Sequence, residues 1–138
     1  MGEPSAPLPA LDADNTPFWT GGGDGRLLIT RCGDCARWLH PPVPVCRFCL
    51  STNVGPEPSS GRGVVLTYTV NRQQWLPALA PPYVIAVIGL DDDPELRVST
   101  RLVGVEPEAV RIGMRVHAVF EPAGDVWLPL FRPDGAPP

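Results

Sequence analysis

The sequence predicts a mainly β protein in which a short N-terminal helix and a four-cysteine ribbon precede a small five-stranded barrel. Nineteen prolines and fourteen glycines among 138 residues leave little room for long helices and favour short strands joined by turns. Apolar and polar residues alternate with a period of two through much of the second half of the chain. Cys32, Cys35, Cys46 and Cys49, the only cysteines, form two C-x2-C pairs separated by ten residues.

The cysteine spacing is that of a metal site. Each C-x2-C pair can wrap a tight turn around one metal, and two pairs complete a tetrahedral shell of four thiolates. Such a shell suits Zn²⁺ best and leaves no open position for chemistry, so we expect these four residues to hold a structural zinc. The ten-residue gap is shorter than the usual spacing of paired zinc knuckles but fits a small rubredoxin-like ribbon. Iron in the same cage is the competing metal, because geometry alone does not separate the two.

Other uses of the cysteines are less well supported. Two disulfides would need an oxidising compartment, and the N-terminal residues Met1 to Pro4 begin no apolar signal segment. A thioredoxin-like redox motif needs one C-x2-C pair, not two. His40 lies between the pairs, but four cysteines already satisfy zinc, so we expect it to be a surface or supporting residue.

Composition along the chain divides it into four parts. Residues 1–13 are a Pro-rich lead that resembles a flexible linker and is compatible with a domain taken from a longer polypeptide. Residues 14–55 hold the helix and the zinc ribbon, residues 56–133 the barrel, and residues 134–138 a tail. No run of eighteen apolar residues exists, so we expect no membrane span and a cytoplasmic location.

Local signals predict the individual elements. Thr16 followed by Pro17 predicts a short helix through Trp19, ended by three glycines. A short strand is expected at 26–31, and a second short strand and its turn at 38–42. A Gly/Ser/Pro-rich stretch follows at 55–63, and then barrel strands at 64–70, 83–90, 96–102, 115–121 and 126–132, with one helical turn within 105–112.

Three details of the barrel can be predicted more closely. The apolar run 83–90 is typical of a strand buried on both faces, and Pro129 should place the last strand at an edge or at a bulge. Asp91, Asp92 and Asp93 are expected to be solvated carboxylates of a turn. Five strands in this order fit a closed barrel of the OB type.

Charge and residue types exclude several functions. The net charge is -4, and the eleven arginines are scattered, which disfavours a single-stranded nucleic-acid module, the alternative use of a zinc ribbon joined to an OB fold. The chain has no lysine, so Schiff-base chemistry within it is excluded. His117 with Glu121 or Asp125 could form a base and its orienting partner, but no nucleophile is placed by motif. We therefore expect no catalytic residue in this chain alone.

The ordered segments resemble a known family. FWTGGGDGRLLITRC, CGDCARWLHPPVPVCRFC, GRGVVLTYTV, PPYVIAVIGLDDDPELRVSTRLVG and IGMRVHAVFE…WLPLFRP occur in the order found in the acyl-CoA-associated OB-fold family with a rubredoxin-like zinc ribbon, domain-of-unknown-function family 35. The resemblance covers residues 14–133 and is greatest to the domains that join a lipid-transfer-protein-like, thiolase-fold aldolase in steroid side-chain degradation.

The resemblance implies an accessory subunit, or a domain of a longer hydratase subunit, that binds a thiolase-fold partner and helps to hold an acyl-CoA. The partner would be a steroid acyl-CoA retro-aldolase that supplies the acid–base groups, in a heterotetramer built on its dimer. CoA offers phosphates for arginine, an adenine for stacking and an apolar arm, so the candidate CoA-binding residues are Arg62, Tyr68, Arg72, Tyr83 and Arg132. Trp75 and Leu76, in a long apolar loop, are the candidate partner interface.

Overall fold

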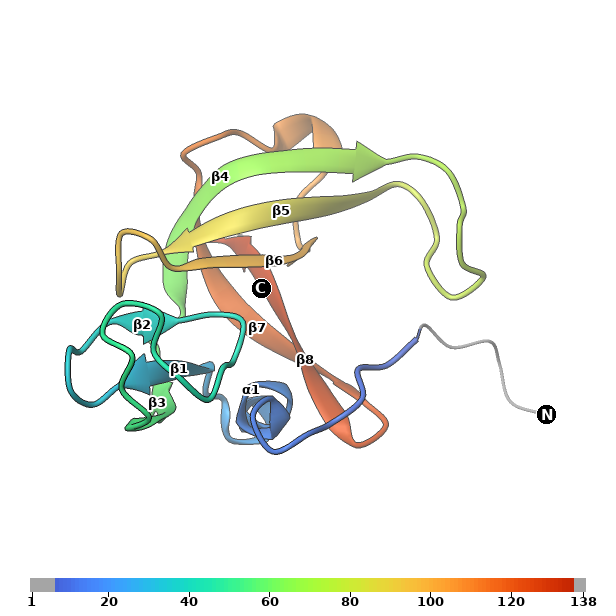
Figure 1. Ribbon diagram of the computed structural model, residues 1–138. Helices are drawn as coiled ribbons and strands as arrows, with labels where there is room; N and C mark the ends of the chain where they lie inside the picture. Colours follow the sequence, from blue (N-terminus) through green and yellow to red (C-terminus); the bar gives the residue numbers. More distant parts are fainter. Residues whose placement is uncertain (1–6, 136–138) are drawn as a thin grey trace.

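The computed structural model describes residues 7–135 and places a small ribbon sheet beside a β-barrel (Figure 1). No helix within these residues is long and apolar enough to cross a membrane. The elements, in chain order, are α1 (Thr16–Thr20), the 3-10 helix η1 (Gly21–Asp24), β1 (Leu28–Cys32), β2 (Trp38–Leu39), β3 (Val54–Pro58), β4 (Arg62–Asn71), β5 (Tyr83–Leu90), β6 (Arg97–Leu102), the 3-10 helix η2 (Pro107–Ala109), β7 (Arg115–Ala123) and β8 (Val126–Pro133).

The prediction of a helix, a cysteine ribbon and a closed five-stranded barrel is confirmed. Strands β4 to β8 close in the order β4-β5-β6-β8-β7, with β7 paired back to β4. All pairs are antiparallel except β6 with β8, which run parallel and share one bridge, between Leu102 and Phe131. Few backbone contacts therefore join β6 to β8, and we call this boundary the β6–β8 seam. A cavity lies beside the seam, between the barrel and α1.

The ribbon contains a strand that the sequence signals did not predict. Val54–Pro58 forms β3 and pairs antiparallel with β1 over five residues, giving a three-stranded sheet in the order β2-β1-β3. Pro56 and Pro58 and the glycines around them have the composition of a loop. Because β3 lies at the edge of the sheet, the missing N–H groups of its prolines are tolerated there.

Strand β5 differs from the expected strand with two buried faces. Val84, Ala86, Ile88 and Leu90 point into the core, whereas Ile85 is 37% exposed and faces a cavity. In β4, a register shift at Leu66 interrupts the simple alternation: Val65 is buried, and the inward face continues with Tyr68 and Val70.

Pro129 does not lie at a free edge, and no bulge accompanies it. Its strand lies between β6 and β7, and the register with β7 runs unbroken from Val126 to Pro133. The single bridge to β6 leaves few ladder bonds on the other side of β8, and the carbonyl of Pro129 accepts a hydrogen bond from Thr100 Oγ1 at 2.6 Å there. Because few backbone hydrogen bonds join β8 to β6, a proline is tolerated there although β8 is not an edge strand.

Helix α1 begins one residue earlier than expected and is prolonged by a 3-10 turn. Asn15, not Thr16, is the N-cap residue, and the three glycines continue the chain as η1 rather than ending it. A Cβ on Gly22 would lie 2.6 Å from Phe120 and 2.7 Å from Trp127, so only glycine allows η1 to pack this closely on β7 and β8.

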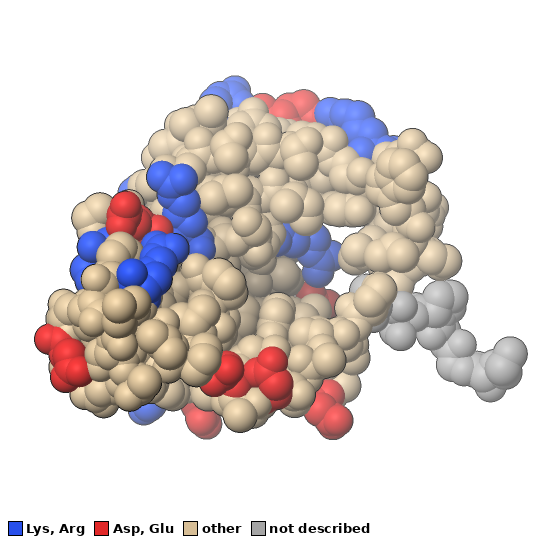
Figure 2. All heavy atoms as spheres, viewed as in Figure 1, with Lys and Arg blue, Asp and Glu red and all other residues tan. Residues whose placement is uncertain are grey.

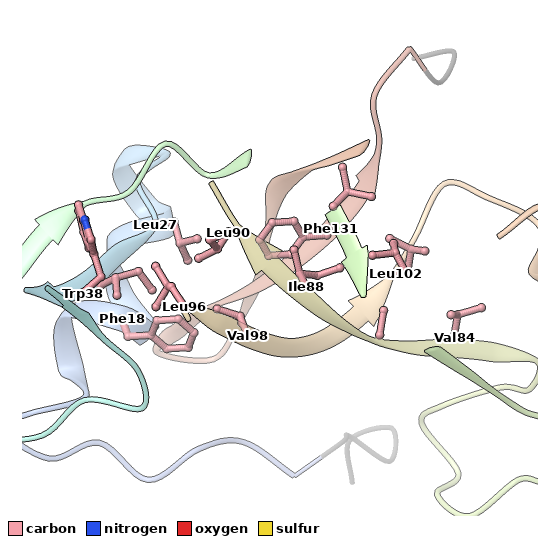
Figure 3. Close-up of a cluster of buried hydrophobic side chains, with 14 of the residues drawn as sticks. Phe18, Leu27, Trp38, Val84, Ile88, Leu90, Leu96, Val98, Leu102 and Phe131 are labelled. Carbon is pink, nitrogen blue, oxygen red and sulfur yellow. The ribbon is translucent and has the colours of Figure 1, made fainter. Parts of the chain in front are cut away.

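One hydrophobic core runs through both parts of the molecule. Figure 3 shows Phe18, Leu27 and Trp38, from the N-terminal part, at one end of a cluster that continues through the barrel to Leu102 and Val84. All of these side chains are at least nine-tenths buried. The ribbon and barrel therefore share this core, and a second, smaller cluster of Cys32, Leu39 and Cys46 lies within the ribbon.

The carboxylate of Asp93 joins the two parts. Arg37, two residues after Cys35, donates to it through Nε at 2.8 Å and Nη2 at 3.1 Å, and the backbone N–H of Trp38 donates at 3.3 Å. The Arg37 guanidinium also stacks on Phe48 of the second cysteine pair, 3.8 Å from the ring centroid. These hydrogen bonds, led by those from Arg37, hold the pKa of Asp93 below its usual range.

The other two aspartates of the turn also have partners. The expectation of solvated carboxylates is wrong for Asp93, which is 5% exposed, whereas Asp91 remains exposed. Asp91 forms a bidentate ion pair with Arg115, with one contact at 2.9 Å. Asp92 accepts hydrogen bonds from Ser59 Oγ at 2.7 Å and from the backbone N–H of Ser60 at 2.9 Å. The β5–β6 turn is thus tied to β7, to the segment after β3 and to the ribbon.

We predict that Asp93→Asn destabilises the protein by about 2 kcal/mol at neutral pH, less than for a fully buried pair because Arg37 is about one-third exposed. Asp125→Asn, an exposed turn residue, serves as the matched control and should change stability little. Urea unfolding of both variants measures the difference.

The pH dependence of this loss has a definite sign. Because the folded pKa of Asp93 is lowered, its contribution is fully present above the unfolded value of about 4 and is lost as the pH falls through the folded pKa. The gap between wild type and Asp93→Asn should therefore shrink below about pH 4. A gap that is independent of pH would contradict an ionic role for Asp93.

Candidate functional site

The four cysteine side chains converge on one point, as their spacing predicted. Their Sγ atoms all lie within 4.8 Å of one another. The Sγ atoms of Cys32 and Cys49 are 3.6 Å apart, and those of Cys35 and Cys46 are also 3.6 Å apart. Sulfurs bound tetrahedrally to one Zn²⁺ at about 2.3 Å would be about 3.8 Å from one another. The site therefore fits a single tetrahedral metal ion.

Backbone N–H groups around the cysteines favour thiolates. The N–H groups of Cys35 and Asp34 each lie 3.4 Å from Cys32 Sγ, and that of Phe48 lies 3.4 Å from Cys46 Sγ. The bond from Cys35, with that from Asp34, lowers the pKa of Cys32 to about 6 against the opposing effect of desolvation, and backbone N–H groups also lower the pKa of Cys46. Desolvation and the neighbouring thiols raise the pKa values of Cys35 and Cys49, so the low values belong to one cysteine of each pair. A thiolate is the form that binds metal.

Polar side chains also join the two cysteine pairs to each other. The Asp34 carboxylate, between the first two cysteines, accepts hydrogen bonds from Ser51 Oγ and from Asn53 Nδ2 at 3.3 Å. Ser51 Oγ in turn accepts the backbone N–H of Asn53 at 2.9 Å. Cys32 and Cys46 are fully buried. Four protein ligands and this supporting shell describe a structural metal site without an open catalytic position.

His40 is not a member of the cysteine cluster, in keeping with its expected non-ligand role. Its ring packs on Phe18 with a centroid distance of 4.8 Å, and its buried Nδ1 has no hydrogen-bond partner among the described residues. Burial lowers the pKa of His40 to about 4, so the ring is neutral at neutral pH. His40 lines a cavity of about 710 Å³ between α1 and the outer face of β5, β6 and β8.

The five candidate CoA-binding residues do not form one site. Tyr68 is partly buried against the core, Tyr83 lines the 710 Å³ cavity, and Arg72 is 3.7 Å from Glu108. Arg62 and Arg132 lie elsewhere, on β4 and β8. The two tyrosines thus lie in apolar surroundings, and the three arginines lie on other parts of the barrel.

Arg62 and Arg132 belong to one row across three strands. Arg62 pairs in register with His117 of β7, and His117 pairs with Arg132 of β8, so the three residues share the outer face. The Nδ1 of His117 is 2.6 Å from Asp134 Oδ1, and Arg62 is 3.6 Å from the same carboxylate. The orienting partner of His117 is thus Asp134, not Glu121 or Asp125. Glu121 and Asp125 are closer to His117 in the sequence. The pairing of β8 with β7 brings Asp134, which follows β8, next to His117.

Trp75 and Leu76, the candidate interface residues, lie on the β4–β5 loop, which projects from the barrel (Figure 1). Trp75 is 65% exposed, and its indole Nε1 donates to Asn71 Oδ1 at 2.8 Å. A large apolar side chain held by a hydrogen bond in solvent contributes little to the core and presents a ready contact surface.

Family models match both parts of the chain. Residues 19–55 match the rubredoxin-like zinc ribbon domain of ChsH2, and residues 56–121 match the C-terminal OB-fold domain of ChsH2. A solved structure described as the Ltp2-ChsH2(DUF35) aldolase is 35% identical, with a TM-score of 0.82 over 91% of this chain and 98% of that chain. The chain belongs to the DUF35 family.

Curated relatives agree with this DUF35 assignment. A probable enoyl-CoA hydratase alpha subunit of Thermomonospora curvata is 36% identical over 92% of this chain, and the 3-oxo-4,17-pregnadiene-20-carboxyl-CoA hydratase alpha subunit of Mycobacterium tuberculosis is 33% identical over 91%. The chain spans 40% of the length of each. A DUF35 domain-containing scaffold protein of Pyrococcus furiosus is 34% identical over 68% of both chains.

We predict one bound metal ion per chain and its loss on removal of a single thiol. Cys49→Ser should lower the metal content well below one equivalent, because a hydroxyl is a poor substitute for a thiolate in this shell. His40→Gln should keep full occupancy. Metal analysis by mass spectrometry on purified protein measures both, and loss of metal from His40→Gln alone would overturn the four-cysteine assignment.

Proposed function

We propose that this DUF35 chain is an accessory subunit or domain of an acyl-CoA-processing complex, with a thiolase-fold protein as its partner. The observation that carries the proposal is the close match, in sequence and fold, to the ChsH2(DUF35) part of an aldolase. Relatives described as hydratase alpha subunits and as a scaffold protein support the same role. The partner in this proposal is a steroid acyl-CoA retro-aldolase, and the complex is a heterotetramer built on the partner's dimer.

The chain supports the partner's reaction and does not perform it. Its four thiols are committed to a closed metal shell, for which zinc is the proposed ion, and the chain has no lysine. His117 has an orienting carboxylate in Asp134, but no nucleophile among the described residues accompanies the pair. The acid–base groups of a retro-aldol step are therefore assigned to the partner.

The partner contact proposed here centres on Trp75 and Leu76. Interfaces gain most of their affinity from a few large side chains that become buried, and Trp75 is both exposed and held in place by Asn71. Its loop is joined to the barrel at both ends and carries no part of the buried core. Binding can therefore use this loop without disturbing the fold.

The polar row on β4, β7 and β8 is the proposed contact with CoA. Arg62 and Arg132 lie on either side of His117, and guanidinium groups bind phosphate oxygens through paired N–H donors. Tyr68 and Tyr83 fit this role less well because they lie in apolar surroundings, and Arg72, which follows β4, lies outside the row.

Co-purification of the chain with its thiolase-fold partner tests the accessory role. We expect a stable complex, and acyl-CoA cleavage by the pair but not by this chain alone. A chain that ignores the partner and turns over acyl-CoA by itself would overturn the proposal.

We predict that Trp75→Ala weakens partner binding by about 2 kcal/mol, because truncation of a central aromatic anchor has an effect of this size. Ile112→Ala is the matched control, since Ile112 is 70% exposed and lies outside this loop. Isothermal titration measures both affinities, and equal effects of the two substitutions would remove Trp75 from the interface.

For the CoA contact, we predict that Arg62→Gln raises the KM of the complex for acyl-CoA about tenfold and leaves kcat nearly unchanged, since a phosphate contact acts on binding. Arg97→Gln removes an exposed arginine of β6 outside the row and should leave both constants unchanged. Steady-state kinetics of the assembled complex distinguish the two. A fall in kcat alone would argue against a phosphate-binding role.

A further inference from the structure

The cavity of about 710 Å³ lies on the side of the barrel where β6 and β8 separate. Its floor is the outer face of β5, β6 and β8, and its walls come from α1, the His40–Pro42 segment and the β4–β5 loop. Figure 2 shows a recess on this face of the molecule, beneath the projecting loop. The cavity is therefore built from parts of the ribbon, the helix and the barrel together.

Apolar side chains make up most of the lining. Trp19 comes from α1, Leu79 from the β4–β5 loop, Ile85 from β5 and Leu128 from β8. Ile85 is one of the few large apolar side chains of the barrel strands that are more than one-third exposed. A strand residue that faces outward is usually polar, so an isoleucine at this position indicates contact with something other than water.

The charged groups of the lining are electrically balanced. Arg101 Nη2 is 2.9 Å from Glu121 Oε2, so the cation is neutralised within the cavity wall. The pair still offers both donors and acceptors to a neutral hydrogen-bonding group. His40 adds a ring that is neutral at neutral pH and has an unpaired Nδ1.

This face is the ligand-binding surface of OB folds, formed by the second and third barrel strands and the loops after the first and fourth. A nucleic-acid strand on such a face needs unpaired cations and aromatic rings open for stacking. Here the arginine is paired, and Trp19 forms an edge-to-face contact with Phe18, with centroids 4.8 Å apart. The volume instead falls in the range of about 300–1,000 Å³ that is typical of small-molecule sites.

We propose that this cavity binds a neutral, mostly apolar small molecule, which inserts its hydrocarbon body between Trp19 and Ile85 and places one hydrogen-bonding group at the Arg101–Glu121 pair. The site lies within this chain and does not depend on the proposed partner or on the polar row. Two sources share this chemistry, a rigid polycyclic ring system and a linear hydrocarbon chain.

Nuclear magnetic resonance on the metal-loaded full chain, without a partner, tests the proposal. Progesterone represents a neutral polycyclic ketone, decanol a linear chain, and an oligothymidylate serves as the nucleic-acid probe. We expect saturable amide shifts around Ile85, Thr100 and Arg101 with at least one of the two apolar probes, and none there with the oligothymidylate. The probe with the higher affinity identifies the source.

Matched variants locate the site. Ile85→Trp fills the cavity and should weaken binding by about tenfold or more, whereas Leu66→Trp, at an equally exposed position of β4 (both residues are 37% exposed), should have no effect. Ser99→Trp fills the cavity from β6 and keeps the test decisive if Ile85→Trp does not fold.

Several outcomes would overturn the inference. These are no saturable shifts with either apolar probe, shifts that map away from the cavity, equal binding by the filled and control variants, or binding of the oligothymidylate at the cavity. Amides of the cavity that respond only to a protein partner would make this surface part of the interface instead.

Discussion

The ion pair between Arg37 and Asp93 is the contact on which the arrangement of this molecule depends. Arg37 follows the first cysteine pair, stacks on Phe48 of the second, and reaches the β5–β6 turn of the barrel through two N–H groups. Trp38, the next residue, hydrogen-bonds to the same carboxylate and extends its side chain into the common core. One carboxylate thus fixes the metal ribbon in position and orientation on the barrel.

This joint links the metal site to the rest of the fold. The metal organises the turn that carries Arg37, and the core side chain of Trp38 follows directly, so the free energy of metal binding becomes folding free energy for more than the ribbon. The His40–Pro42 wall of the cavity begins one residue after β2. A structural metal therefore helps to shape a surface that lies outside its own coordination shell.

The sequence predicted those features whose signals are local. Period-two patterns and apolar runs located the five barrel strands, and cysteine spacing located the metal ligands. Strand β3 was missed because its two prolines and its neighbouring glycines have the composition of a loop, and its pairing with β1 is a tertiary fact. The hydrogen bonds and ion pairs of Asp91, Asp92 and Asp93 and the His117–Asp134 pair were not predicted either, because they too are tertiary contacts. The cavity had one local signal, an outward-facing isoleucine in β5, which the sequence alone does not distinguish from burial on a second face.

The chain has no lysine, and its ion pairs give a physical reason for arginine at some positions. Within the part of the chain that the structure describes, ion pairs are formed by Arg31, Arg37, Arg62, Arg72, Arg101 and Arg115. Arg37 and Arg115 each meet an aspartate with two nitrogens. An ammonium group is a point charge and cannot reproduce that planar fork. At these two positions the β5–β6 turn requires arginine itself, because the geometry of the fork, as well as its charge, sets the position of the turn.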